Sequence, residues 1–208
     1  MRTLIILVVI CVAVSAFAIV PSPYIGANVQ VNSPTGKFRQ TDIVDEEGGA
    51  KTGLGGELDI GLTSGGGSIY AGYRFGKHSA EASYDTLRAS GDWNINRWVI
   101  GARWHILGST PLPIVPTVGG GVTVGKTKVS AQAASGSQSI DESKTSKSSI
   151  GWFLEAGGLL KPPGPLSVIA DIQYHSFDAE YESQLYDGKV KVAFFTFQLG
   201  ARFTILPL

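Results

Sequence analysis

The sequence predicts an all-β protein, a closed antiparallel up-and-down transmembrane β-barrel of about eight strands that follows an N-terminal signal peptide. Three observations predict this architecture. Several segments alternate between apolar and polar residues, which is the period of a strand with one apolar face. After the first 18 residues, no stretch is apolar for the length of a membrane-spanning helix. The connections between the alternating segments are short and long in turn, as in membrane barrels.

Composition agrees with this class. Charged residues make up 16% of the 208 residues and hydrophobic residues 43%, whereas soluble domains carry about 25% charged residues. Such a weakly charged chain needs either a large core or a non-aqueous surface. Lysine plus arginine and aspartate plus glutamate number 17 each, and no basic stripe is present. We therefore expect no nucleic-acid partner.

The N-terminus has the features of a cleaved signal peptide. A short basic start is followed by an apolar run from Leu4 to Val14 and by Ser15-Ala16-Phe17-Ala18, an A-x-A cleavage site. A membrane anchor is the alternative, but the run is shorter than the ~20 residues of a spanning helix. We predict a signal peptide over residues 1–18 and a single barrel domain over residues 19–208. The one cysteine, Cys11, lies within the apolar run, so the predicted mature domain has no disulfide.

Two segments predict strands most clearly. In Arg97–Ile106 the apolar face consists of Trp98, Ile100, Ala102, Trp104 and Ile106, and in the final segment it consists of Phe195, Phe197, Leu199, Ala201, Phe203 and Ile205. Polar residues and glycines occupy the opposite face of both segments, together with Val99 in the first. As a helix, the final segment would scatter its polar residues among the phenylalanines, so a strand is the better prediction.

Six further segments show the same alternation less strictly. They are Tyr24–Val31, Leu54–Thr63, Ile69–Phe75, Val115–Val124, Ser149–Leu160 and Ser167–His175. The total is eight, an even number, as single-chain bacterial barrels require. A turn at Gly76-Lys77-His78 would split the third strand and give nine. We interpret these residues as a kink or bulge in one long strand that runs to about Tyr84.

The connections differ systematically in length. Short segments rich in glycine and proline are Ser64–Gly67, Gly108–Pro113 and Lys161–Pro165, which predict tight turns. Long polar segments are Arg39–Thr52, Thr86–Asn94, Ser130–Lys147 and Glu182–Lys189, which we predict to be loops. Short turns at one end and long loops at the other are typical of outer-membrane barrels.

The two faces of the strands predict which side meets lipid. The aromatic residues predicted to face lipid are Trp98, Trp104, Trp152, Tyr174, Phe195, Phe197 and Phe203. The opposite face carries glycines and a near-balanced set of charges, which suits a narrow closed interior. The residues predicted to form a structural charge network in the lumen are Glu57, Asp59, Arg74, Arg103, Glu155, Asp171 and Arg202.

The chain resembles the small eight-stranded bacterial outer-membrane β-barrel domain family over essentially its whole predicted mature length. The resemblance rests on GYRFG at Gly72, VIGARWHIL at Val99, TVGGGVTVG after a proline-rich turn, FLEAGGLL at Phe153 and FTFQLGARFTI at Phe195. It implies an outer-membrane location, contact with outer-membrane lipids, and export and barrel-assembly machinery as partners. We expect a monomer. Family members act as tethers, adhesins, resistance factors or narrow pores, and the resemblance does not choose among these roles.

No catalytic, metal or cofactor site is predicted. The three histidines lie on different predicted strands without metal-ligand spacing. His175 and Ser176 are adjacent on a strand and point to opposite faces, so the histidine does not activate the serine. Gly119-Gly120-Gly121 lies within a predicted strand and lacks the lysine and helix of a phosphate loop. We predict that the chain is not an enzyme.

Three functional interpretations remain open at this point. The first is an integral barrel with a structural or surface-interaction role carried by long external loops. The second is a narrow channel or passive carrier for small solutes, although about eight strands leave an interior that side chains nearly fill. The third is a soluble exported barrel of the lipocalin type, with the aromatic face turned inward.

Overall fold

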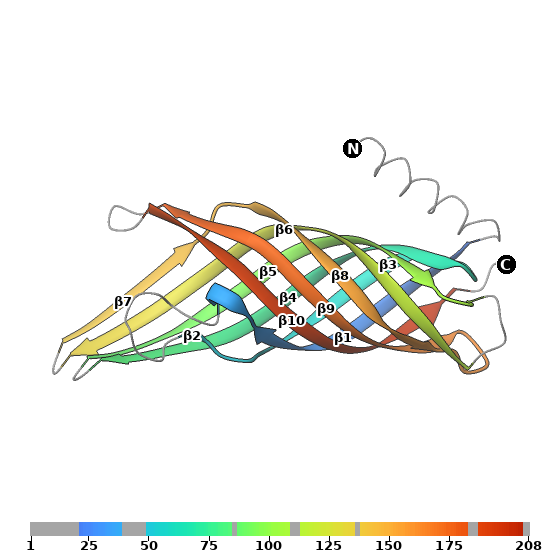
Figure 1. Cartoon of the computed structure of the whole chain (residues 1–208), viewed down its shortest axis with the longest axis horizontal. Helices are drawn as coiled ribbons and strands as arrows, with labels where there is room; N and C mark the ends of the chain where they lie inside the picture. The colour runs from blue at the N-terminus through green and yellow to red at the C-terminus, as the bar shows by residue number, and fades with distance from the viewer. Residues whose placement is uncertain are drawn as a thin grey trace.

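The computed structural model describes residues 21–38, 49–84, 87–108, 113–135, 138–182 and 187–205, and these residues form an elongated barrel (Figure 1). Among them, no helix is long and apolar enough to cross a membrane. The predicted signal peptide lies outside the described residues.

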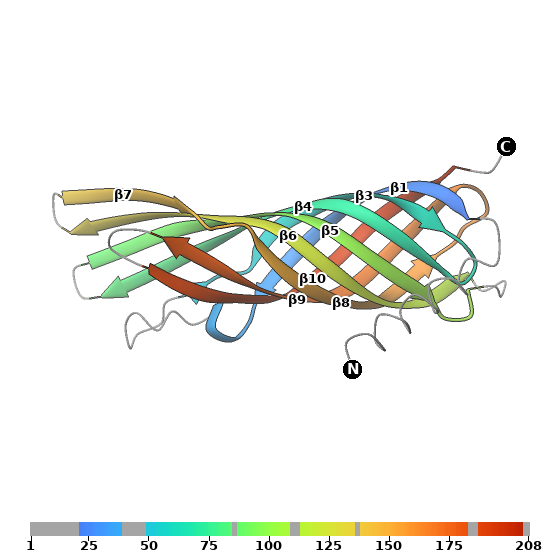
Figure 2. The same cartoon turned by 90° about the horizontal axis from the view of Figure 1, so that it is seen from above.

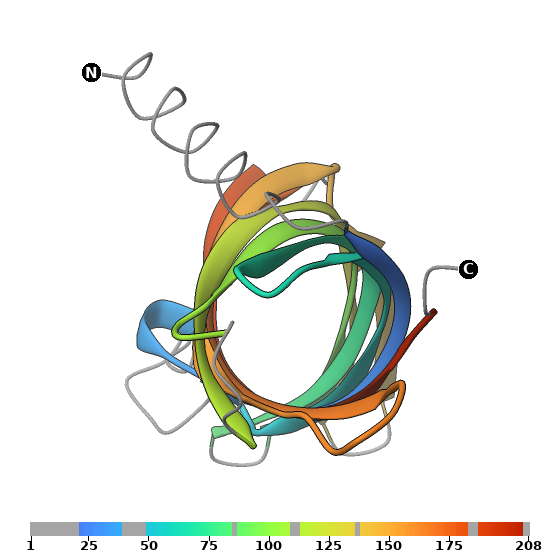
Figure 3. The same ribbon diagram turned by 90° about the vertical axis from the view of Figure 1, so that its right-hand side faces the viewer.

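Eight strands form the barrel wall, and each is antiparallel to both neighbours. They are β1 (Ser22–Pro34), β3 (Gly53–Thr63), β4 (Gly67–Tyr84), β5 (Leu87–His105), β6 (Ile114–Ser135), β8 (Ser149–Leu160), β9 (Leu166–Glu182) and β10 (Asp187–Thr204). Strands that follow one another along the chain are paired, and β1 also pairs with β10. The last pairing closes the ring seen end-on in Figure 3. The predicted fold and strand number are therefore confirmed.

Three small elements lie on this wall. The two-residue strand β2 (Gly49–Ala50) pairs with β4, and β7 (Gln138–Thr145) pairs with the far part of β6. The 3₁₀ turn η1 (Gly36–Phe38) follows β1 and lies against β10. Together β2 and η1 extend the wall beyond the short strands β1 and β3.

The residues Gly76-Lys77-His78 lie inside one continuous strand. β4 runs from Gly67 to Tyr84, and its pairing with β5 passes through Lys77–Asn94 and His78–Trp93 without a break. The prediction of one long strand is confirmed, and its ladder with β5 contains no bulge at this point.

The prediction of long polar loops was wrong for much of three segments, while residues 39–48 of Arg39–Thr52 lie outside the described residues. β5 already begins at Leu87, so most of Thr86–Asn94 is strand. β6 continues to Ser135 and β7 follows from Gln138, so most of Ser130–Lys147 is a hairpin. β9 reaches Glu182 and β10 begins at Asp187. Polarity identifies contact with water but does not distinguish a loop from a strand whose polar side chains are exposed.

The barrel has two different ends. We call the end with the short connections at residues 64–67, 106–113 and 161–165 the turn end, and the opposite end the hairpin end. Figure 2 shows the strands around β7 projecting far at the hairpin end, while the start of β1 and the end of β10 lie at the turn end. The predicted turn at residues 64–67 is present, with the Ser64 amide donating to the Gly67 carbonyl at 2.8 Å.

An apolar belt surrounds the barrel near the turn end. Outward-pointing residues of every strand are large and exposed there, for example Trp98 at 64% and Ile100 at 63%. On β6 the outward apolar run extends from Ile114 to Val124, which matches the ~9–11 residues of a tilted membrane strand. The apolar face therefore points outward, which excludes the lipocalin-type arrangement.

Between the belt and the hairpin end, the polarity of the two faces is reversed: the outward face becomes polar and the inward face apolar. On β5, Asn94 and Asn96 point outward, whereas Ile95 is buried inside. At the hairpin end an interior apolar cluster is formed by Phe38, Ala50, Ile95, Phe177, Ala179, Tyr181, Val192 and Phe194. An apolar interior and a polar exterior are the arrangement that water requires, so this part of the barrel lies outside the lipid.

Candidate functional site

The seven charged residues predicted for the lumen are all buried inside the barrel. Each lies on the inward face of its strand, because strand neighbours alternate in direction. Their predicted role as a structural network stays a prediction, but their geometry can be described. The structure brings five of them into two ion-pair groups and leaves the other two, Asp59 and Arg202, outside these groups.

The first group is centred on Arg74 of β4. Its guanidinium pairs with Glu57, the residue directly opposite on β3. The same guanidinium reaches across the barrel to β9, where it donates to Gln173 Oε1 at 2.8 Å and contacts the ring of His175 at 2.7 Å. His175 is in turn stacked between Phe153 and Phe194, with ring centroids 5.5 and 4.9 Å away. Arg74 thus links opposite walls.

The second group is centred on Arg103 of β5. Its Nη2 lies 2.7 Å from Glu155 and 3.0 Å from Asp171. Glu155 also accepts hydrogen bonds from the Tyr70 hydroxyl and from Gln173 Nε2, both at 3.0 Å. Because Gln173 contacts Arg74 as well, it joins the two groups into one network.

Neutral side chains continue the network round the barrel. Gln30 donates to Gln198 at 2.8 Å, and Asn28 donates to Asp59 at 3.1 Å. Thr196 donates to Asn32 at 2.7 Å. These residues were not predicted individually, although their inward position follows from the alternation of the strands. They occupy the space that an open channel would need.

Arg97 is a buried lumen residue that the prediction omitted. It donates to the Thr123 hydroxyl at 2.9 Å and to the Ser149 carbonyl at 2.7 Å, and it lies 3.8 Å from the centre of the Phe177 ring. The sequence contained a signal for this position, because the alternation of β5 places Arg97 on the face opposite its aromatic residues and therefore towards the lumen. With Arg97 included, the buried described residues hold four arginines and four carboxylates.

The aromatic residues predicted to face lipid lie on the outward face. Six are exposed and Tyr174 is half-buried by its neighbours. Trp152, Tyr174 and Phe195 form a cross-strand row with ring-centroid distances of 5.5 and 5.2 Å. Trp104 and Phe203 lie nearer the turn end. Aromatic residues near both edges of the belt are typical of membrane interfaces.

The hairpin-end cluster also holds titratable residues. His78 is completely buried, with its Nδ1 3.1 Å from the Lys51 carbonyl and its ring 5.4 Å from that of Phe38. Burial lowers the pKa of His78 and raises the pKa of Tyr181. The sequence signal for this cluster was present in Phe177–Tyr181, whose inward residues are apolar and whose outward residues are charged.

No described group of residues has the arrangement of a metal site. His175 points into the lumen and its neighbour Ser176 lies on the other side of β9, because adjacent strand residues face opposite ways. The pair therefore does not form a nucleophile and its base.

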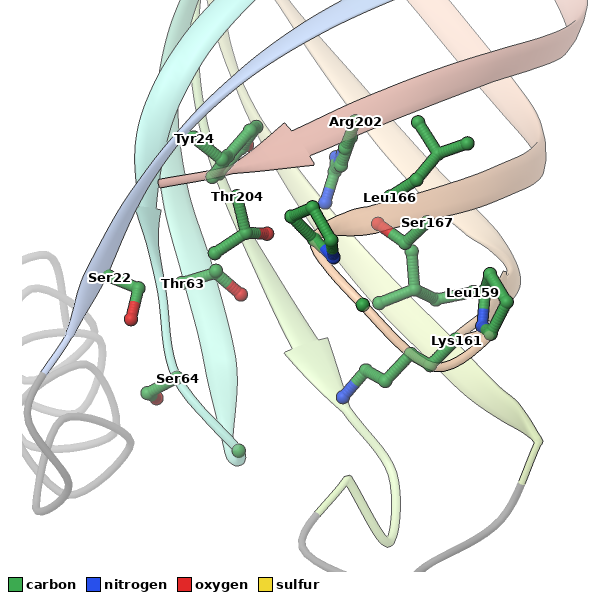
Figure 4. Close-up of a pocket in the computed structure, with 14 residues that line it drawn as sticks. Ser22, Tyr24, Thr63, Ser64, Leu159, Lys161, Leu166, Ser167, Arg202 and Thr204 are labelled. Carbon is green, nitrogen blue, oxygen red and sulfur yellow. The ribbon is translucent and has the colours of Figure 1, made fainter. Parts of the chain in front are cut away.

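A cavity of about 300 Å³ opens at the turn end (Figure 4). The side chains of Arg202 and Lys161 lie on two sides of it. The cavity is lined by residues of β1, β3, β8, β9 and β10 and by the Lys161–Pro165 turn, where Gly164 has a φ of 111°. A side chain at that φ is strained, so glycine suits the turn.

Comparison with known proteins identifies the family to which the fold belongs. A family model described as "Outer membrane protein beta-barrel domain" matches residues 4–203. Among solved structures, the chain is similar to Neisserial surface protein A, with 12% identity, a TM-score of 0.50, and coverage of 88% of this chain and 97% of that one. It is also similar to the outer membrane protein OprG from Pseudomonas aeruginosa, with 12% identity, a TM-score of 0.53, and coverage of 89% and 97%. None of the curated proteins matches the chain significantly.

Proposed function

Because this chain belongs to the outer membrane protein β-barrel domain family, we propose that it acts at the cell surface as a closed, non-conducting barrel. The protein is located in the bacterial outer membrane. In such barrels the short turns face the periplasm and the long connections face outward. The role that we propose for the hairpin end is interaction with a surface outside the cell, with the membrane part as its anchor.

The filled lumen supports the non-conducting part of the proposal. Arg74 extends from β4 to Gln173 and His175 on β9, and Arg103 joins β5 to β8 and β9. Ions would have to displace these contacts, and breaking buried ion pairs is costly. This observation disfavours the alternative of a narrow channel.

The hairpin end supports the interaction part. β4 continues from Phe75, the last outward apolar residue of its belt, to Tyr84, which is about 30 Å along a strand. The projecting strands are paired with one another and enclose the apolar cluster around Phe177. Such a packed projection presents side chains in fixed positions, unlike a flexible loop.

Two outward lysines at the base of this projection favour an anionic partner. Lys126 and Lys128 on β6 are exposed just beyond the belt, beside the uncharged Asn96 and Asn94 of β5.

We also propose that the protein is a monomer in contact with outer-membrane lipids, and that the envelope export and barrel-assembly machinery handles it. The apolar belt that passes over every strand supports the contact with outer-membrane lipids.

Conductance tests the closed state. The protein, extracted from outer membranes and inserted in planar lipid bilayers, should give no discrete current steps, while its unheated and boiled forms migrate differently on a gel. Regular steps from a folded sample would support the channel alternative instead.

Surface labelling tests the orientation. A membrane-impermeant maleimide should label Gln132→Cys on intact cells, and should label the matched turn-end variant Pro163→Cys only after permeabilisation. The reverse pattern would contradict the orientation. Both positions are exposed, and the natural Cys11 lies in the predicted signal peptide.

Retention on dextran sulfate beads tests the anionic partner. Cells carrying the protein should be retained more than cells lacking it, and the double variant Lys126→Gln/Lys128→Gln should lose most of this difference. Lys191→Gln, at another exposed lysine on β10, is the matched control. Equal retention of the double variant and the wild type would contradict this part of the proposal.

A further inference from the structure

The cavity at the turn end is lined by two cationic side chains, Arg202 and Lys161. Within the part of the chain that the structure describes, its lining contains no aspartate or glutamate. This differs from the rest of the lumen, where arginines and carboxylates are interleaved. The cavity is therefore a local concentration of positive charge in an otherwise balanced interior.

Arg202 is the most unusual of the buried arginines. Arg74 and Arg103 each pair with a carboxylate, and Arg97 donates to neutral oxygens. Arg202 is only 3% exposed, yet among the described residues its Nε has no hydrogen-bond partner and its guanidinium forms no ion pair, and it lies 4.7 Å from the centre of the Tyr24 ring. A buried cation without a partner is costly unless an anion joins it. Its guanidinium points into the cavity (Figure 4).

Lys161 faces the same space from the 161–165 turn. It is half-buried and makes no ion pair among the described residues. Burial lowers the pKa of its ammonium group, because the charged form loses hydration there. An anion in the cavity would compensate for that loss.

The remaining polar groups of the lining are mainly hydroxyls. Those of Ser22, Thr63, Ser167 and Thr204 line the cavity. A planar guanidinium binds two oxygens of one oxyanion at once, an ammonium binds phosphate as a point charge, and hydroxyls donate further hydrogen bonds. This set of donors matches the tetrahedral oxygens of a phosphate group.

We propose that the turn-end cavity is a phosphate-binding site, in which Arg202 and Lys161 hold the phosphate oxygens and the surrounding hydroxyls complete their hydrogen bonds. In the orientation proposed above, the site faces the periplasm, and it is independent of the role proposed for the hairpin end. Its ligand is a free phosphate ion or the phosphate of a lipid headgroup at the barrel rim. Both sources present the same chemistry to the cavity.

The test uses the protein extracted from outer membranes into dodecyl maltoside, in a buffer without phosphate. Inorganic phosphate is titrated in one arm and phosphatidylglycerol in the other. The side-chain Nε–Hε resonance of Arg202 reports the location of binding, and it is identified by its loss in Arg202→Gln. The line width of the ³¹P signal reports affinity in every variant, and the gel shift on heating shows that each variant is folded.

We expect a saturable shift of the Arg202 resonance in wild type. Arg202→Gln should weaken binding about tenfold or more, since it removes charged hydrogen bonds, and Lys161→Gln about two- to fivefold. Lys191→Gln, at an exposed lysine near the other end of the barrel, should bind as wild type. A shift with phosphatidylglycerol alone assigns the site to a lipid headgroup, and a shift with inorganic phosphate assigns it to the free ion. No saturable shift in either arm, or equal affinity in all variants, would overturn the proposal.

Discussion

Replacing Arg103 by alanine tests whether the lumen charges hold the barrel together. Arg103 is 2% exposed and is the one cation that bridges Glu155 and Asp171. Its loss leaves two buried carboxylates with no cation between them. We expect lower stability without the appearance of conductance.

The magnitude follows from what each carboxylate retains. Glu155 keeps hydrogen bonds from Tyr70 and Gln173 at 3.0 Å, whereas Asp171 keeps a long one from Gln198 at 3.4 Å. Breaking a buried pair costs about 3–5 kcal/mol. Because Glu155 stays bonded, we expect the lower end, about 3 kcal/mol. Arg103→Ala/Asp171→Asn should recover at least half of this loss, because it removes the less well bonded charge.

The assay is urea unfolding of the protein in lipid vesicles, with the folded fraction read from the mobility of unheated samples. Lys77→Ala is the matched control, since Lys77 pairs with Asp92 at 2.8 Å on the exposed surface. That variant should lose less than about 1 kcal/mol. Planar bilayers provide the parallel measurement of conductance.

Two results would refute the reasoning. If Arg103→Ala unfolds at the same urea concentration as wild type, the network does not brace the barrel. If the same variant also gives discrete current steps, Arg103 acts as a plug in a conducting path, and the channel interpretation becomes the better one.

Three further predictions concern other parts of the molecule. Because burial lowers the pKa of His78 below its ordinary 6.5, its contribution to stability is present above about 6.5 and is lost as the pH falls below it. The protection factors of the η1 amides, which are corrected for the intrinsic pH dependence of hydrogen exchange, should therefore fall at acid pH in wild type, and an equal fall in His78→Gln would contradict this. Leu199→Arg, in the middle of the outward belt of β10, should cost about 2–4 kcal/mol in urea unfolding in vesicles; an unchanged midpoint would show that this face does not meet lipid. Gly101→Ala would place a Cβ 2.6 Å from the Tyr70 ring, so we expect a loss of about 1–3 kcal/mol in the same assay, and no loss would show that the ring moves freely.

The resemblance to the family allowed the fold to be recognised before the structure was considered, but the residues alone already indicated much of it. Strict alternation in Arg97–Ile106 identified a strand and assigned Arg103 and Trp104 to opposite faces, because side-chain direction in a strand is a local property. The even strand number and the short turns followed from the same local patterns.

The hairpin end was predicted incorrectly for a physical reason. Asp92 and Ser130 lie in polar segments whose composition predicts loops, yet they are partners in the ladder between β5 and β6. Polar residues suit an exposed strand as well as a loop, and the pairing that distinguishes them comes from a distant segment of the chain. In Trp93–Asn96 the sequence already places apolar residues on the inward face and asparagines on the outward face. Interpreting this change requires knowing where the membrane ends, which the sequence does not show.

Local alternation was therefore sufficient to assign the strands of the belt, their faces and the charges that point inward, since these depend on neighbours one or two residues apart. Which of the inward residues meet follows from the folded barrel. Arg74 and His175 are far apart in sequence and contact each other across the barrel, while Arg202 belongs to the same inward set and forms no ion pair with any described carboxylate. Such partnerships depend on closure and register, which are properties of the whole ring of strands.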